Sequence, residues 1–551
     1  MRLFASLLGI GTFLAARGAA AVDADPSNYE AVVPALVAGD TLDLAPGTYS
    51  GNLDIVGLAG TADQPIVIQG PADGSAVFTG NGCCNTVEIT DSSYVVIKNL
   101  TIDGQGLDGV FGVSTKGNNT THHITIEGCR FIGHGASQQT VAISTKSPTW
   151  GWVIRRNVID GAGTGLYLGN SDGSQPFVDG VIENNLVMNT IGYNMQIKFQ
   201  NAWPQGSGLP ETPTSTIIRD NVFIKNDAPS PDGDRPNLLV GGFPETGPGS
   251  ENQYEIYGNL FFHNPREALL QASGRVSIHD NVFVDAVGAA IVVTDHDLPL
   301  RRARIYNNTI YGVATGIRFG SSAPEGDFVR ANLVFAPELL SGPAVDVADN
   351  LSLQLADAPA VVSSPSTMLG SMDFYPLPGQ AQGSAVDLAP VAADVHYDVD
   401  FNRTPKGMAM FRGAYAGEGD NPGWQLDATL KNVGTEPSTT STSSTGSGAG
   451  SGGTTGAGAG SAGAGGGGGA SGDSTDGADD GCGCATTRES PRRLGLPTVA
   501  ILGLVLALRR RRRQRAFAAA ASSASWIILP CSFGSAQRRR PSSGSRWIGS
   551  K

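Results

Sequence analysis

The chain has 551 residues, a formal net charge of −13 and 75 glycines, and only 16% of its residues are charged. Arginines gather near the two ends, so residues 22–487 are more acidic than the chain as a whole. Because nucleic-acid binding depends on clustered positive charge, we do not expect nucleic acid as a partner of this acidic body.

The first residues predict export from the cytoplasm. Arg2 is followed by an apolar run from Leu3 to Leu14 and by small residues at 18–21, which is the order of a secretory signal peptide. We therefore expect residues 1–21 to be removed. Residues 25–37 then have the spacing of a short amphipathic helix that starts near Ser27 or Asn28, and we expect it to cover the exposed end of the strands that follow.

A short phrase recurs from residue 99 to residue 350. It consists of an apolar residue, two further residues, an asparagine, and one or two more apolar residues. Good copies centre on Asn157, Asn185, Asn221, Asn259, Asn281, Asn308, Asn332 and Asn350, and weaker ones on Asn99 and Cys129. Successive good copies are 18 to 38 residues apart. A repeat this short without helical periodicity predicts an all-β fold, a single-stranded right-handed parallel β-helix with three short strands per coil. We expect each asparagine to occupy a left-handed corner and to hydrogen-bond its copy in the next coil.

The early coils also carry a family resemblance. The stretches GDTLDLAPGTYSG (39–51) and GTADQPIVIQG (60–70) resemble the N-terminal coils of the pectate-lyase-like β-helix superfamily, which includes the alginate lyases related to chondroitinase B. With the repeat, the resemblance covers roughly residues 30–415. It implies the fold and does not by itself imply an activity.

Three cysteines lie in this part of the chain, at Cys83, Cys84 and Cys129. In an exported protein one pair of them could form a disulfide, although a bond between adjacent cysteines is strained. Alternatively, all three are small residues that fill buried positions. The sequence leaves both interpretations open.

One strand face carries the candidate binding residues. In MQIKFQ (195–200) the alternation predicts Met195, Ile197 and Phe199 inside and the polar residues between them outside. Aligned strands and their corners extend this to an outward set consisting of Lys116, Lys146, Tyr167, Tyr193, Gln196, Lys198, Gln200 and Arg318. A basic, hydrogen-bonding row with tyrosines on an acidic body suits carboxylated sugars. The alternative is that these side chains only solubilise the strand face.

Three long loops follow Lys198 and predict the walls of a groove. They span residues 200–214, 226–236 and 243–253. In the first loop, Trp203 is a candidate surface for sugar stacking. In the second, Asp227, Asp232 and Asp234 are candidate ligands of Ca²⁺, the one cofactor that we consider, although acidic loops are ordinarily just solvated.

Two chemistries are open if the groove is catalytic. Elimination at a uronic acid needs a cation near the carboxylate and a base, for which we nominate Lys198. In the chondroitinase-B-like lyases that the chain resembles, a strand lysine works with an arginine on the following coil. Here the following coil, PNLLVGGFP (236–244), has no arginine, so Arg219 and Arg235 are the candidate substitutes.

Hydrolysis would instead need paired carboxylates. Gly133-His134-Gly135 resembles an element of polygalacturonases, but the upstream aspartate motifs of that family are missing, so we interpret it as a turn. Asp295-His296-Asp297 is interpreted as a polar corner rather than a metal site or a proton relay.

The C-terminal third predicts a cap and a surface anchor. Residues 374–417 resemble the terminal segment of exported bacterial β-helix proteins and predict a cap on the last coil, within a body that we place at residues 22–430. Residues 431–481 are rich in Gly, Ser and Thr and predict a disordered linker. In residues 482–515, Cys482 and Cys484 precede an apolar run, Leu494 to Leu508, and an arginine cluster.

That order resembles the MYXO-CTERM sorting signals of myxobacteria. The resemblance implies attachment at Cys482 or Cys484, contact of the apolar helix with the membrane, and recognition by a sorting and processing machinery. We therefore expect display on the surface of a Gram-negative cell or, alternatively, secretion after processing. Residues 516–551 depart from the pattern and are expected to be disordered.

The sequence thus leaves three functional hypotheses. The first is a lyase that cleaves a uronic-acid polymer by β-elimination at Lys198. The second is a non-catalytic glycan-binding or adhesive surface protein. The third is a glycoside hydrolase or an epimerase. All three take a polysaccharide as the partner.

Overall fold

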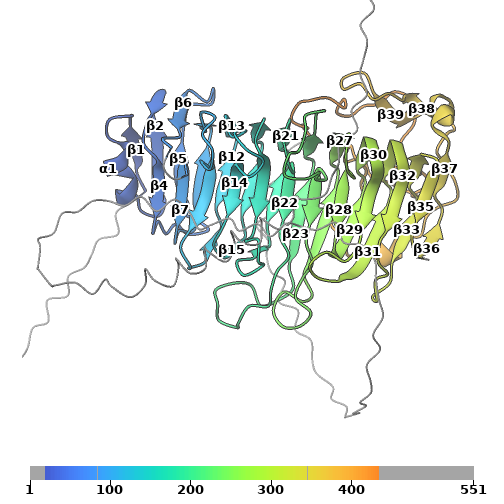
Figure 1. Cartoon of the computed structure of the whole chain (residues 1–551). Coiled ribbons are helices and arrows are strands. Elements are labelled where there is room, and N and C mark those ends of the chain that lie inside the picture. Colours follow the sequence, from blue (N-terminus) through green and yellow to red (C-terminus); the bar gives the residue numbers. More distant parts are fainter. Residues whose placement is uncertain (1–18, 83–84, 344, 434–551) are drawn as a thin grey trace, which may run out of the picture. The chain divides into compact units, whose positions relative to one another are not determined.

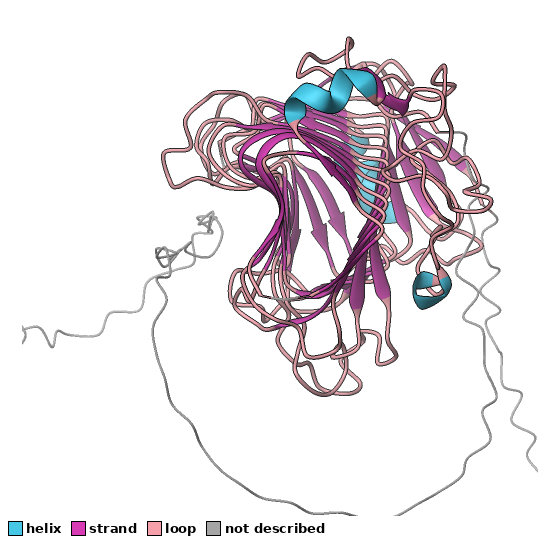
Figure 2. Ribbon diagram, turned by 90° about the vertical axis from the view of Figure 1, so that its right-hand side faces the viewer, coloured by secondary structure: helices cyan, strands magenta, loops and turns pink. Residues whose placement is uncertain are grey.

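The computed structural model describes residues 19–82, 85–343 and 345–433, and these residues form a parallel β-helix (Figure 1). A typical coil contributes one strand to each of three ladders. In Figure 2 the strands of successive coils lie over one another around a common interior. The prediction of a parallel β-helix is confirmed.

The first ladder is a 13-stranded sheet. Its strands are β1 (Ala21–Ala24), β2 (Thr41–Leu44), β5 (Ile66–Gln69), β8 (Val95–Lys98), β12 (Thr125–Glu127), β16 (Val153–Arg155), β20 (Val181–Glu183), β23 (Ser215–Arg219), β26 (Gln253–Tyr257), β29 (Gly274–His279), β31 (Leu300–Tyr306), β33 (Phe328–Arg330) and β36 (Asp346–Ala348).

The second and third ladders are joined because two long strands, β30 (Val282–Val293) and β32 (Thr309–Phe319), run through both. The second ladder also contains β3 (Gly47–Tyr49), β6 (Ala76–Thr79), β9 (Thr101–Asp103), β13 (Arg130–Ile132), β17 (Val158–Asp160), β21 (Leu186–Met188), β24 (Val222–Ile224), β27 (Leu260–Asn264), β34 (Leu333–Phe335) and β37 (Leu351–Leu353). The third contains β4 (Leu53–Val56), β7 (Val87–Thr90), β10 (Val113–Lys116), β14 (Val141–Thr145), β18 (Thr164–Leu168), β22 (Met195–Ile197), β25 (Leu238–Val240), β28 (Leu270–Ala272) and β35 (Glu338–Ser341).

The remaining elements are short. Two-residue strands β11 (Thr121–His122), β15 (Thr149–Trp150) and β19 (Phe177–Val178) pair at the corner after the third ladder, and β38 (Val362–Ser364) pairs with β39 (Asp373–Pro376). The helices are α1 (Tyr29–Val32) and the 3-10 turns η1 (Val33–Ala35), η2 (Leu355–Ala360) and η3 (Ala389–Val391). No helix in the described ranges is long and apolar enough to cross a membrane.

The asparagine ladder forms as predicted. From Asn157 to Asn332, each ladder Nδ2 donates to the Oδ1 of the asparagine in the next coil at 2.9 to 3.0 Å, and the row ends at Asn350. Each of these Oδ1 atoms also accepts a backbone N–H from the coil before it. Buried amides are thus satisfied along the whole row, which is the condition for keeping a polar column inside a protein.

Two details of the ladder differ from the expectation. The left-handed residue of each corner is the one before the ladder asparagine, as at Asn184, Asp220 and Asp280. Asn99 is itself left-handed, so Leu100 takes the ladder position in that coil. Cys129 does occupy a ladder position, and its N–H donates to Asn157 Oδ1 at 2.9 Å.

Cys129 is a free, buried cysteine, and burial raises the pKa of its thiol to about 12. It is therefore one of the small core residues that the sequence allowed. Cys83 and Cys84 lie outside the described residues, so whether they form a disulfide stays open.

The N-terminal cover is shorter than expected. The helical part spans α1 and η1, seven residues in all, since Pro34 at the start of η1 favours a tighter turn. Tyr29 of α1 is buried and packs edge-on against Tyr49 and Phe78, with ring centroids 5.1 and 5.5 Å apart. The helix therefore covers the first coils, as predicted.

The segment after β37 lies beside the coils and does not simply close the last one. The outward side chains of the second ladder are apolar, as Leu186, Val222 and Leu260 show, and they form one hydrophobic cluster with Phe374, Tyr415 and other residues of the C-terminal segment. At the far end of this segment, Lys431 O accepts a hydrogen bond from Asn184 Nδ2 at 2.9 Å. The predicted cap is thus a lateral layer.

Several predicted segments cannot be compared with the structure. Most of the signal peptide, nearly all of the linker at 431–481, the anchor signal at 482–515 with Cys482 and Cys484, and residues 516–551 lie outside the described residues.

Candidate functional site

A pocket opens on the outward face of the third ladder, over the coils of β14, β18 and β22. It brings together five residues that the sequence nominated, namely Tyr167, Tyr193, Gln196, Lys198 and Arg235. Gln138, Gln139, Val141 and Thr164 complete its lining. We treat this pocket as the candidate functional site.

Strand β22 places the central side chains. Its inward residues Met195 and Ile197 are fully buried, while Gln196 stands in register with Tyr167 of the preceding coil. The next residue outward, Lys198, has a glycine beside it in both neighbouring coils, because Lys198 N–H donates to Leu168 O and Gly241 N–H to Ile197 O. A Cβ on Gly241 would come within 2.3 Å of Phe199 N, so this close packing requires glycine there.

Gln196 and Lys198 are buried, and Lys198 Nζ lies 5.9 Å from the centroid of the Phe199 ring. Gln196 is 3% exposed and Lys198 8%, and neither side chain has a hydrogen bond or an ion pair within the described part of the chain. Their polar atoms nevertheless reach the space of the pocket. Polar groups removed from bulk water without a partner are costly, so these two side chains favour a ligand that supplies one.

Arg235 enters the pocket from the loop at 226–236. Its guanidinium lies 5.6 Å from the ring centroid of Tyr193 and donates to the backbone oxygens of Asp232 and Asp234, both at 3.1 Å. No carboxylate stands among the described residues that line the pocket. Arg235 and Lys198 therefore leave net positive charge there, which suits an anionic ligand.

The other nominated cations lie at increasing distance from the pocket. Lys146 sits one coil before Tyr167, with Nζ 4.5 Å from its ring centroid, and so extends the site. Lys116 forms an ion pair of 2.7 Å with Glu88, which offsets its charge. Arg318 is exposed on the same outward row as Gln196 but four coils further on, or about 19 Å at the usual spacing of strands.

Three nominated residues have other roles. Arg219 belongs to the first ladder, where it pairs with Glu183 at 2.7 Å, so it does not assist Lys198. Gln200 is fully buried and donates to Phe177 O at 2.8 Å. Trp203 is 7% exposed and packs with Val178 and Leu209, so it does not offer the stacking surface that we expected.

The three aspartates of the loop at 226–236 do not converge. Asp227 contacts His263 Nε2 at 3.2 Å, and Asp234 lies 3.9 Å from Arg266. Asp232 uses its backbone, which accepts from Arg235. No group of three or more His, Cys, Asp or Glu side chains among the described residues could hold a metal ion. The predicted Ca²⁺ ligands therefore do not fit that ion, and we derive no step through it.

The two histidine motifs have the structural roles that we expected. His134 is 1% exposed, with Nδ1 3.2 Å from Val110 O, in a bend whose Gly133 has a φ of 71°. Asp295 Oδ1 accepts from Leu300 N–H at 2.8 Å, which closes a polar corner.

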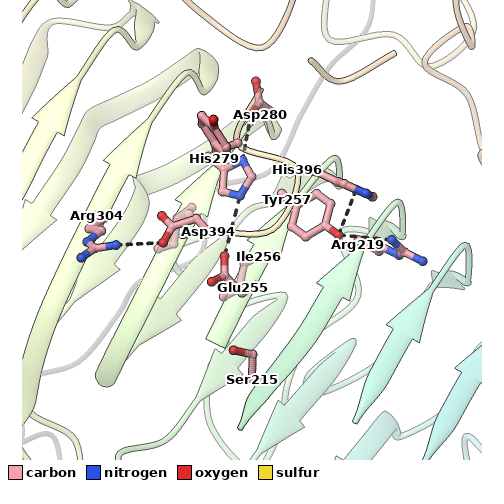
Figure 3. A network of polar contacts seen from close by, with 12 residues as sticks. Ser215, Arg219, Glu255, Ile256, Tyr257, His279, Asp280, Arg304, Asp394 and His396 are labelled. Carbon is pink, nitrogen blue, oxygen red and sulfur yellow. Dashed lines mark hydrogen bonds and ion pairs between the residues drawn. The ribbon is translucent and has the colours of Figure 1, made fainter. Parts of the chain in front are cut away.

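A second polar cluster lies between the first ladder and the C-terminal segment (Figure 3). His279 Nδ1 lies 2.7 Å from Asp280 Oδ2, and Glu255 Oε2 lies 3.9 Å from His279 Nε2. Burial raises the pKa of Glu255. Burial alone would lower the pKa of His279, but contacts with Asp280 and Glu255 outweigh it and raise that pKa.

The C-terminal segment adds charges to this cluster. Lys406 Nζ donates to Asp280 at 2.8 Å, and Asp394 accepts from Arg304 at 2.8 Å (Figure 3 draws the second contact). Glu255 and His279 are fully buried, and Asp280, Asp394 and Lys406 are nearly so. With no access for a substrate, this cluster holds the segment in place.

Comparison with known proteins bears on the fold. Residues 141–329 match the profile of the family described as "Right handed beta helix region". No curated protein sequence matches the chain.

Solved structures similar to this one include an alginate lyase from Paenibacillus sp., with 15% identity over 60% of this chain and 99% of that one, at a TM-score of 0.34. They also include a pectate lyase, with 14% identity over 75% and 98% of the two chains, at 0.37. A third is the A-module of a mannuronan C-5 epimerase from Azotobacter vinelandii, with 16% identity over 59% and 93%, at 0.35. Together, the parallel ladders and the family match identify the described body as a right-handed parallel β-helix.

Proposed function

We propose that the pocket binds a carboxylated sugar of an acidic polysaccharide and cleaves the chain there by β-elimination. One observation carries the proposal: two side chains that are more than nine-tenths buried, Gln196 and Lys198, line a pocket that also holds Arg235, and neither has a hydrogen bond or an ion pair with any described residue.

Charge selects the class of ligand. A carboxylate about 4 Å from one of the two cations gains roughly 4 kcal/mol at the effective dielectric constant of a protein surface, before desolvation is subtracted. A neutral sugar would leave both cations without a counter-charge. Tyr167 and Tyr193 add aromatic rings against which the apolar face of a pyranose packs. A uronic-acid unit matches all of these features.

The reaction assigns one task to each group. Arg235 pairs with the uronate carboxylate and so acidifies the hydrogen on the carbon that bears it. Lys198 first loses its own proton to solvent; its amine then takes the proton of the sugar, the electron pair becomes a carbon–carbon double bond, and the bond to the glycosidic oxygen breaks. The phenol of Tyr167 or Tyr193 protonates the departing oxygen. The new chain end is an unsaturated uronate.

The lining also bears on the alternatives. Hydrolysis requires two carboxylates across the scissile bond, and the described pocket residues include none. A non-catalytic glycan-binding protein needs only cations, amides and rings, so the same lining suits that function too. Turnover separates it from a lyase.

The decisive experiment measures turnover and affinity together. The purified protein is incubated with alginate, pectate and glycosaminoglycans, and new ultraviolet absorbance reports the double bond. Lys198→Met keeps the length of the side chain and should lower turnover by about 10²-fold or more while affinity changes little. Arg318→Met, on the same row but outside the pocket, is the matched control. Loss of affinity without any double bond would leave a binding protein, and no binding to any uronate polymer would refute the proposal.

We further propose that the protein is exported and displayed through Cys482 or Cys484. This rests on the resemblance of residues 482–515 to a sorting signal. Replacing both cysteines with alanine should move the protein from the cell surface into the medium, as cell fractionation would detect. Unchanged surface protein would contradict the proposal.

A further inference from the structure

The loop at 226–236 carries Arg235 into the pocket but has little packing of its own. Asp227, Asp232, Gly233 and Asp234 are exposed. At the end of the loop, the backbone oxygen of Arg235 accepts hydrogen bonds from Lys225 Nζ at 2.8 Å and from Asn264 Nδ2 at 3.0 Å. These contacts fix the main chain at Arg235, and Ser230 Oγ ties the loop further back by donating to Ile191 O at 2.6 Å, which leaves the stretch between them, residues 231–234, to be held by another contact.

Gln138 holds the middle of the loop. Its Nε2 donates to Gly233 O at 2.9 Å, and its Oε1 accepts from Asp232 N–H at 3.1 Å. The two ends of one amide thus hold two peptide units of the loop, the one before Asp232 and the one after Gly233. Gln138 is 4% exposed and belongs to the pocket lining, so its amide is shielded from water although its partners in the loop are exposed.

The sequence makes room for this contact. Gln138 precedes β14, three coils before the loop that it holds, and it passes Gly163 and Gly192 at the same corner of the two intervening coils. A Cβ on Gly163 would lie 1.9 Å from Ser137 O, and one on Gly192 would lie 3.0 Å from Gln138 Cγ. Glycine at both positions is what allows the backbone before β14 to lie this close.

The contact of Gln138 with the loop also affects the guanidinium of Arg235. The two bonds fall on the peptide units on either side of the one that joins Asp232 to Gly233, and the oxygen of that middle unit, Asp232 O, accepts from Arg235 Nη2 at 3.1 Å. Gln138 therefore sets the position of a carbonyl that orients Arg235 above Tyr193. Lys225 and Asn264 act on the backbone of Arg235, while Gln138 acts on the direction of its side chain.

We infer that Gln138 is a positioning residue: it latches the middle of the loop at 226–236 so that Arg235 points into the pocket to receive an anionic group. The effect of Gln138 on the affinity for an anionic ligand rests on the proposed function, whereas its effect on the conformation of the loop does not. Gln138 touches no reacting atom and acts through Arg235.

The test uses Gln138→Leu, which keeps the volume and removes both hydrogen bonds. Two neutral hydrogen bonds correspond to about a tenfold or greater loss of affinity for a uronate oligosaccharide. In an Arg235→Met background the same substitution should change affinity less than twofold, because the group that it positions is gone. Gln380→Leu, at an exposed glutamine far along the chain, is the control and should leave the affinity unchanged both in the parent protein and in the Arg235→Met background.

Hydrogen exchange gives a readout that needs no ligand. The N–H of Asp232 should exchange faster in Gln138→Leu than in the parent protein, while amides of β22 stay protected. Additive losses in the double variant, or unchanged exchange at Asp232, would overturn the inference. If no uronate oligosaccharide binds the parent protein, the proposed function fails, and exchange at Asp232 alone then decides whether Gln138 is the latch.

Discussion

Replacing Asn259 with leucine should destabilise the protein strongly, for a reason that can be counted from the ladder. Asn259 Nδ2 donates to Ile218 O at 2.8 Å and to Asn281 Oδ1 at 2.9 Å, and its Oδ1 accepts from the backbone and the side chain of Asn221. Leucine fits the site, since Leu100 occupies the same column in an earlier coil. The loss is therefore polar rather than steric.

At least three buried groups lose a partner in this variant: Ile218 O and the two nitrogens of Asn221. At about 1 to 3 kcal/mol for each group, and with incomplete additivity, the free energy of unfolding should fall by about 3 to 6 kcal/mol. That is a large part of the stability of an ordinary domain. Urea unfolding followed by circular dichroism measures it directly.

Asn350→Leu is the matched control, because Asn350 ends the ladder and is only partly buried, so water can replace its partners. We expect a loss of about 1 kcal/mol there. Asn307, which is adjacent to a ladder position, would be a poor control because it is 5% exposed and has a φ of 50°. Equal losses at Asn259 and Asn350 would contradict the idea that buried pairing stabilises the ladder.

Three further outcomes follow from buried groups elsewhere. Burial raises the pKa of Asp179 to about 6, so the charged carboxylate lowers the stability of the folded protein above that pH, and this loss fades as the pH falls toward 4. Asp179→Asn should therefore stabilise the protein by about 1 to 2 kcal/mol at pH 7 and by little at pH 4. Urea unfolding at both pH values would show the difference. Lys431→Met should destabilise by about 3 kcal/mol or more, measured in the same way, because it leaves the buried Asp220 with one cationic partner, Arg403, in place of two. Cys129 should resist alkylation in the folded protein and react on unfolding, as peptide mass spectrometry would detect, because burial both shields the thiol and raises its pKa.

The repeat predicted the fold correctly because each copy of the phrase marks the same local structure. An apolar strand residue, a corner and a buried amide recur in every coil, so several weak signals support one register. The left-handed corner was placed one residue too late because the ladder asparagine recurs more clearly than the residue before it. Asn, Asp, Gly and even Ala fill that preceding position, as Asn184, Asp220, Gly258 and Ala331 show. Its varied identity conceals it in a single sequence.

Residues of the candidate site were placed correctly where the apolar–polar alternation of a strand continues, and wrongly where the strand ends. Alternation placed Gln196 and Lys198 on the outer face correctly. It failed at Gln200 because β22 ends at Ile197, after which Phe199 is partly exposed and Gln200 turns inward. Closeness in sequence also misled for Arg219, since consecutive strands of one coil belong to different ladders.

Gln138 shows a different limit. Its partners lie 94 and 95 residues further along the chain, and no local pattern links a glutamine before β14 with a loop after β24. The glycines at 163 and 192 were visible in the sequence, but their use depends on which corner they share. Only the stacking of coils places Gln138, the two glycines and the loop together.

The buried cluster of Figure 3 has the side chains of an acid–base site, yet its surroundings assign it to assembly. Taking charges such as Asp280 and Lys406 out of water costs several kcal/mol for each ion, which their attraction barely offsets. The apolar layer beside them, where residues such as Phe374 and Tyr415 cover the second ladder, supplies the net gain on docking. The ion pairs then fix where along the coils the segment docks, since one coil of slippage would leave each charge buried and unpaired. None of the described residues of this segment lines the pocket, which lies on the third ladder, whereas the later coils of the second ladder are covered by the segment.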